Sequence, residues 1–161
     1  MTFLQQRERL ITGKLFHGIS SCYAEIQNLV KSGQWRNVVK IYQQNIHTLK
    51  LSPGAHSMLK LAHLKLGDLK MATQEERQVT YLIQQIIKTG EGNREKPYLI
   101  TIMSDVHDIV GDELLNEWQE KHGNRLIDIV QLSGATVCFD ISHLRRFIRF
   151  SPVKCPPKLP K

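Results

Sequence analysis

Two glycine turns set 34 residues apart are the feature that most constrains this chain. Gly33-Gln34-Trp35 and Gly67-Asp68-Leu69 each lie between two segments whose apolar residues recur every three or four positions. That period places apolar side chains on one face of a helix. Glycine ends helices readily, because it adopts the left-handed conformation at no steric cost. The spacing therefore predicts two consecutive helical hairpins between Ile19 and Ile87.

The four expected helices have recognisable ends. The first starts near Ile19, with Ser20 or Ser21 as its N-cap, and the second runs to Leu49. The third begins after Ser52-Pro53, because a proline disfavours helix before it and suits the first turn after it. Asp68 is placed to cap the fourth. A further, looser helix pattern with a break at Gly13 covers residues 3–16.

The period changes after Pro97, where helical spacing gives way to alternation. Residues 98–103 read as a strand, and residues 105–121 as a helix with a break at Gly111. Residues 125–132 and 135–141 are two β-rich runs separated only by Ser133-Gly134, which predicts an antiparallel hairpin. Residues 142–150 suggest a short basic helix with Leu144, Phe147 and Ile148 inward.

The predicted fold class is α+β, with N-terminal tetratricopeptide-like hairpins packed against a small antiparallel sheet of about three strands. Two hairpins alone leave an apolar face in water, so the sheet is the expected cover. Its inner face is expected to carry Ile127, Ile129, Val137 and Phe139. Cys138 then points outward, although its apolar setting favours burial, and a sheet covered on both faces would reconcile the two. The predicted divisions are 1–90, 91–150 packed on it as one compact unit, and a proline-rich basic tail, 151–161.

The 34-residue step is the period of the tetratricopeptide repeat, which the helices resemble. Leu59, Ala62 and Ala72 fall on small or apolar consensus sites of that family, and Trp35 and Tyr42 fit in the first unit. The match is partial, because other consensus positions carry unexpected residues: Glu25, His56 and Lys60.

The second half is similar to a family of uncharacterised bacterial proteins that join such helices to a small β-containing end. The matching segments are Thr89-Gly90-Glu91-Gly92, Pro97 to Ile102, Ser104 to Asp108, and Val137-Cys138-Phe139-Asp140-Ile141. The chain departs from the family pattern at Glu91 and Cys138. The resemblance implies the fold and adds no activity.

The net charge of +7 is concentrated at one end of the chain. Six basic residues and no acid follow His143, which leaves an excess of only +1 for residues 1–143. Such a segment attracts nucleic acid or anionic surfaces by counterion release, and a solvated terminus is the plainer interpretation. The candidate anion or nucleic-acid contacts are Arg145, Arg146, Arg149, Lys154 and Lys158.

Nothing in the sequence indicates a membrane span or a signal peptide, so a cytoplasmic location is the expectation.

The chain has three cysteines, an odd number, and their positions lack the spacing of a metal site: Cys22, Cys138 and Cys155. We expect Cys22 and Cys138 to be small buried hydrophobes.

Candidate chemistry is weak throughout. Asp105, His107 and Asp108 suggest a metal site but lack a second ligand pair, and Asp105 is more simply a helix N-cap or first-turn acid. Residues 89–93 are glycine-rich but follow a helix, the reverse of a phosphate loop, and so predict a helix C-cap and turn. Three histidines on the repeat helices either line a groove or are partly buried between helices: His47, His56 and His63.

The sequence favours a non-enzymatic protein–protein interaction module with a protein or peptide partner, or self-association. The alternatives are nucleic-acid or anionic-surface binding through the basic C-terminus, and an enzyme with a pocket at the helix–sheet junction. No catalytic residue, cofactor or metal is predicted, because no nucleophile, phosphate loop or ligand set has its required context.

Overall fold

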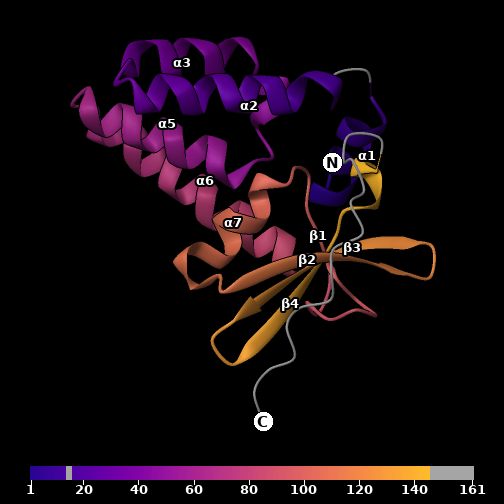
Figure 1. The fold of residues 1–161 in the computed structure, drawn as a ribbon. Helices are drawn as coiled ribbons and strands as arrows, with labels where there is room; N and C mark the ends of the chain where they lie inside the picture. Colours follow the sequence, from indigo (N-terminus) through magenta and orange to yellow (C-terminus); the bar gives the residue numbers. More distant parts are fainter. Residues whose placement is uncertain (14–15, 146–161) are drawn as a thin grey trace. The chain divides into compact units, whose positions relative to one another are not determined.

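A computed structural model describes residues 1–13 and 16–145 of the 161-residue chain. It divides into two units, Met1–Gln85 and a second unit that begins at Ile86, so the boundary falls inside the last long helix. The first unit is helical and the second contains the sheet. The α+β class is thereby confirmed (Figure 1).

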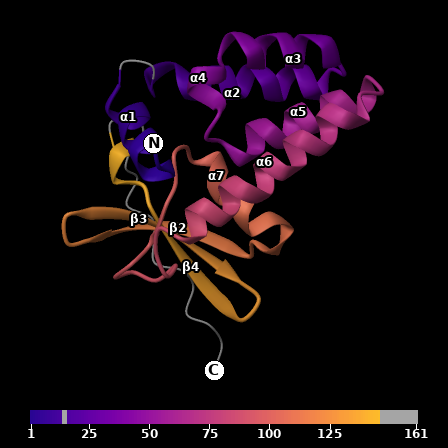
Figure 2. The ribbon, with the colours of Figure 1, turned by 180° about the vertical axis from the view of Figure 1, so that it is seen from behind.

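The first unit consists of helices only. Their bounds are α1 Phe3–Thr12, α2 Phe16–Lys31, α3 Trp35–Gln44, α4 Ile46–Leu49, α5 Pro53–Lys65 and α6 Leu69–Ile87. α2 lies beside α3 and α5 beside α6, and both views show these two pairs (Figures 1 and 2). The buried apolar residues of the predicted stripes lie between them, among them Ile26, Val38, Leu59 and Leu82.

The two hairpin turns have the same backbone geometry. Gly33 has φ +69° and Gly67 has φ +80°, the left-handed region that glycine adopts without strain. In the first turn the Gln34 N–H donates to the Leu29 carbonyl at 2.9 Å; 34 residues later the Asp68 N–H donates to the His63 carbonyl at 2.9 Å. The two turns, 34 residues apart, therefore have the same backbone hydrogen bond at equivalent positions. The assignment to tetratricopeptide repeats stays a prediction.

Several predicted helix ends are confirmed and others are wrong. Ser52 caps α5 with Pro53 at its start, and the Asp68 carboxylate accepts from the Met71 N–H. The predicted cap at Ser20 or Ser21 is wrong, because α2 already begins at Phe16. The second helix ends at Gln44, where Asn45 interrupts it and the Asn45 side chain donates to the Ile41 carbonyl.

The second unit is built on a four-stranded mixed sheet in the order β1-β4-β3-β2. Its elements are β1 Tyr98–Leu99, α7 Ser104–Val110, the 3-10 turn η1 Gly111–Glu113, β2 Asn116–His122, β3 Arg125–Leu132, β4 Ala135–Asp140 and η2 Ser142–Leu144. β2, β3 and β4 pair antiparallel, and β1 pairs parallel with β4. The prediction of about three antiparallel strands is corrected to four strands in a mixed sheet.

The error arose in residues 105–121, where the helix stops at Val110 and β2 begins at Asn116. β2 is polar, and Trp118 is its only large apolar residue, so alternation does not reveal it. The predicted strand at 98–103 is confirmed only at Tyr98 and Leu99. The 142–150 helix is a 3-10 turn over Ser142–Leu144 with Leu144 buried; Phe147 and Ile148 lie outside the described residues.

The predicted inner face of the sheet is also wrong. The Ser133-Gly134 turn pairs Leu132 with Ala135, so Ile129 faces Cys138 and Val130 faces Val137. Ile127 and Ile129 therefore share one face with Cys138 and Trp118, while Val137 and Phe139 lie on the other. Both faces of β3 are buried, and the burial of Cys138 is confirmed. Cys22 is only partly buried, so its predicted burial is wrong.

Candidate functional site

His56 lies in a buried polar network that joins three helices of the first unit. Its Nδ1 lies 2.5 Å from Glu75 Oε2 on α6, and its Nε2 lies 3.1 Å from the Tyr42 hydroxyl on α3. A carboxylate only accepts, so Nδ1 carries a proton. The Lys50 carbonyl lies 3.2 Å from Nε2, where it accepts when that nitrogen is protonated too. Burial, and secondarily Glu75, raise the pKa of the Tyr42 phenol.

The three histidines of the repeat helices separate into two groups. His56 and His63 are buried, and His63 Nδ1 lies 3.9 Å from Asp68 Oδ2. His47 is exposed on α4. The structure therefore gives His56 and His63 the packing role, and it places His47 at the edge of a cavity.

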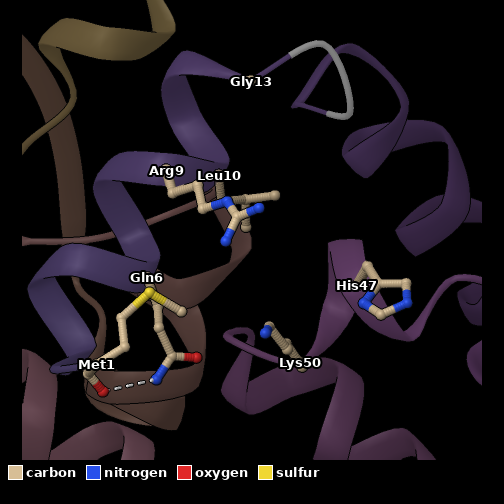
Figure 3. A pocket seen from close by; sticks show the side chains of 7 residues that line it. All are labelled: Met1, Gln6, Arg9, Leu10, Gly13, His47 and Lys50. Atoms are coloured by element: carbon tan, nitrogen blue, oxygen red, sulfur yellow. Dashed lines mark hydrogen bonds between the residues drawn. The ribbon is translucent and has the colours of Figure 1, made fainter.

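That cavity, the α1–α4 cavity, has a volume of about 530 Å³. Its lining comes from α1 and from the α4 region: Met1, Gln6, Arg9, Leu10, Gly13, His47 and Lys50. Figure 3 shows Arg9 extending from α1, with His47 and Lys50 across the opening from it. The Gln6 amide donates to the Met1 carbonyl at 3.3 Å. Three basic side chains and no acid appear among its described lining residues.

A second cavity of about 260 Å³ adjoins the first, since Gln6 and Lys50 line both. Most of its other lining residues are apolar or aromatic: Phe3, Tyr42, Ile46, Leu51, Tyr81 and Leu82, with His56 and Gln78. The two cavities therefore adjoin, and basic side chains are more frequent among the lining residues of the first than of the second.

A different surface lies at the two hairpin turns. We call it the turn surface, and define it by Trp35, Arg36, Leu66 and Leu69. Two hollows of about 430 and 370 Å³ share Arg36 and Leu66 as lining residues, and Trp35 lines the larger. Leu66 is 41% exposed and Leu69 67% exposed. Large apolar side chains that reach solvent together are typical of contact sites.

Asp105, His107 and Asp108, the residues that suggested a metal site, have other surroundings in the structure. Asp105 is buried, and its carboxylate accepts hydrogen bonds from the Thr101 and Ile102 N–H groups at 2.9 and 3.0 Å. These bonds hold the backbone just before α7. Asp105 is thus a first-turn acid of α7 rather than its N-cap. His107 is exposed and 3.9 Å from Glu117. Within residues 1–13 and 16–145, no group of three or more His, Cys, Asp or Glu side chains is arranged to hold a metal ion.

Residues 89–93 form the turn after α6. The Glu91 and Gly92 N–H groups donate to the Lys96 carbonyl, and the Gly92 carbonyl accepts from the Cys138 N–H. These amides are therefore used within the second unit. The prediction of a helix end and turn is confirmed.

Of the predicted basic contacts, only Arg145 lies within the described residues. It is exposed, and its guanidinium donates to the Asn124 carbonyl at 2.5 Å. Arg146, Arg149, Lys154 and Lys158 lie outside them. None of the helices in the described ranges combines the length and apolar character that a membrane crossing requires.

The sequence did not predict the α1–α4 cavity. Arg9 lies on the loosely patterned first segment, and Lys50 follows a helix break that periodicity does not reveal. The sequence did not predict the turn surface either, because Leu66 and Leu69 fall in the apolar stripes of the third and fourth expected helices, yet both are exposed.

Comparison of the chain with protein-family models, with curated proteins and with solved structures finds no match. The resemblance to tetratricopeptide repeats and to a bacterial family stays a prediction.

Proposed function

We propose that the protein is a non-enzymatic interaction module whose turn surface binds an amphipathic segment of a partner protein. The observation that carries this proposal is the exposure of Leu66, which lines both hollows at the hairpin turns, with exposed Leu69 three residues further along the chain. Aromatic and arginine side chains beside a hollow are common anchors of protein interfaces. Trp35 and Arg36 supply both kinds.

Burial of these side chains supplies the affinity. Apolar surface removed from water contributes about 25 cal/mol per Å². Leu66 and Leu69 flank a turn whose backbone is held by the Gly67 and Asp68 hydrogen bonds, so ordering this surface costs little on binding. A preorganised apolar site of this kind suits a partner that inserts one or two large side chains.

The charges around the turns define the rest of the partner. Lys31, Arg36, Lys65 and Lys70 are exposed near the two glycines. The nearby acid, Asp68, is engaged with the Met71 N–H and lies near His63. The surface is therefore basic around an apolar centre, and the complementary partner carries acidic residues next to its apolar anchors.

A random peptide library selected against the full chain tests this proposal. Selected peptides should combine Leu, Phe or Trp with Asp or Glu. Leu69→Glu should weaken their binding by about tenfold or more, because it replaces a 67% exposed apolar side chain of the turn surface with a charge. Leu115→Glu is the matched control, since Leu115 in the second unit is 65% exposed, close to the 67% of Leu69. It should leave the affinity unchanged.

Three results would overturn the proposal. The first is a library that yields no selected peptide, and the second is an equal loss of binding in both variants. The third is a dimer in sedimentation equilibrium that Leu69→Glu dissociates, which would make a second copy of this chain the occupant. Circular dichroism of both variants checks that the helices are intact.

Two other functions stay predictions. Nucleic-acid or anionic-surface binding rests on basic residues of which only Arg145 is described, and salt-sensitive binding that survives changing Arg146, Arg149, Lys154 and Lys158 to Gln would contradict it. An enzyme pocket at the helix–sheet junction likewise stays a prediction.

A further inference from the structure

We infer that the α1–α4 cavity and its apolar neighbour bind a small organic phosphate monoester. The phosphate would lie among Arg9, His47 and Lys50, and the apolar body would extend over Phe3, Ile46 and Leu82. This site is separate from the turn surface, because the two share no lining residue.

The charge of the site selects an anion. Arg9 and Lys50 reach the cavity from opposite sides (Figure 3), and neither side chain makes a hydrogen bond or ion pair within the described residues. Two cations with no acid among the described lining residues lower the energy of an anion placed between them. His47 adds a donor. Gln6 is held by its bond to the Met1 carbonyl and forms the wall.

A phosphate fits these donors better than a carboxylate does. A phosphate monoester carries a charge of about −1.5 to −2 at neutral pH, and its three terminal oxygens accept hydrogen bonds in several directions. The arginine guanidinium forms paired bonds to phosphate oxygens, and lysine supplies a compact charge. A carboxylate presents two oxygens in one plane, which cannot reach donors from two sides equally well.

The adjoining cavity determines the organic part. Lys50 and Gln6 line both cavities, so a ligand whose phosphate contacts Lys50 continues directly into the second one. There it meets Phe3, Leu51 and Leu82, which are buried, and Ile46 and Tyr81, which are about half exposed. The volumes of about 530 and 260 Å³ suit a molecule of cofactor size or smaller. An aromatic or branched apolar body matches this lining.

Titration calorimetry of the full chain with phenyl phosphate, inorganic phosphate and benzoate tests the assignment at constant salt. Phenyl phosphate should bind most tightly, because it uses both cavities. Arg9→Gln and Lys50→Gln should each weaken its binding by about tenfold, the effect of losing one charge-assisted hydrogen bond. Arg77→Gln on α6 and Lys40→Gln on α3 are the matched controls, since both residues are exposed and line neither cavity.

Each other result counts against the inference. Absence of phenyl phosphate binding overturns it, as does equal loss in the control variants. Benzoate binding as tightly as phenyl phosphate would assign the site to carboxylates. Inorganic phosphate binding as tightly as phenyl phosphate would mean that the second cavity contributes nothing to the affinity. Amide proton chemical shifts in NMR spectra report the location: phenyl phosphate should move the Gln6, Arg9 and Lys50 signals and leave that of Leu69 in place.

Discussion

His56 on α5 and Glu75 on α6 form a buried contact in the first unit, with 2.5 Å between Nδ1 and Oε2. The contact connects the two helices of the second hairpin, and Tyr42 ties it to α3. Lys60 and Glu76 connect the same two helices in solvent, at 2.7 Å. The first pair is buried and the second is more exposed, so together they compare a buried contact with one in solvent.

Glu75→Ala should lower the free energy of unfolding by about 3 kcal/mol, because it leaves the His56 donor buried without its acceptor. Glu76→Ala removes the exposed partner and should cost about 0.5 kcal/mol. Urea denaturation followed by circular dichroism measures both. Equal losses would mean that burial of the His56–Glu75 pair does not matter.

Tyr42→Phe should lower the free energy of unfolding by about 1 kcal/mol, since it removes one buried hydrogen bond and keeps the ring. Tyr81→Phe is the control, because Tyr81 is about half exposed and has no hydrogen bond among those described. The same urea titration applies. If Tyr81→Phe lowered the free energy of unfolding as much as Tyr42→Phe, the Tyr42–His56 hydrogen bond would not be the source of the stability.

Gly33→Ala and Gly67→Ala should destabilise the chain by similar amounts, about 1 kcal/mol each, because both glycines have positive φ and ample space for a methyl group. The strain of a positive φ in alanine is then the cause of the lost stability, because the added methyl group meets no close neighbour. Gly18→Ala, inside α2 and also in open space, should instead stabilise the chain by about 0.5 kcal/mol. Thermal unfolding measures the stability of the three variants. Unequal losses in Gly33→Ala and Gly67→Ala would contradict the inference that the two turns are equivalent.

Asp128 should make stability depend on pH in the second unit. Burial, and secondarily the neighbouring Glu117 carboxyl, raise the pKa of Asp128 to about 8. Gln119 opposite it lowers the pKa by a smaller amount, and His107 lies 3.9 Å from Glu117. The folded state then binds more protons than the unfolded state between pH about 4 and about 8, so stability falls as pH rises through that window.

Asp128→Asn should remove this decline and be more stable than the parent chain at pH 8. Asp112→Asn, exposed on η1, should leave the pH profile unchanged. Urea titrations across the window measure both. A parent chain whose stability rises from pH 5 to pH 8 would contradict the raised pKa.

Local signals accounted for most of the helical unit. Glycine turns, the Ser52-Pro53 start and the Asp68 cap act within a few residues, so the sequence predicts them directly. The Asn45 break was missed because it depends on a side chain that bonds to its own preceding turn. In the sheet, the hairpin turn at Gly123-Asn124 was missed, because polar β2 before it shows no alternation.

The sequence by itself determined the α+β class, the two hairpin turns and the β3–β4 hairpin, because each depends on residues close together in the chain. Tertiary structure alone decided which residues share a sheet face, that β1 pairs parallel with β4, and that Arg9 faces Lys50 across a cavity. Those relationships join residues far apart in sequence, and packing rather than local preference sets the register and the distances between them.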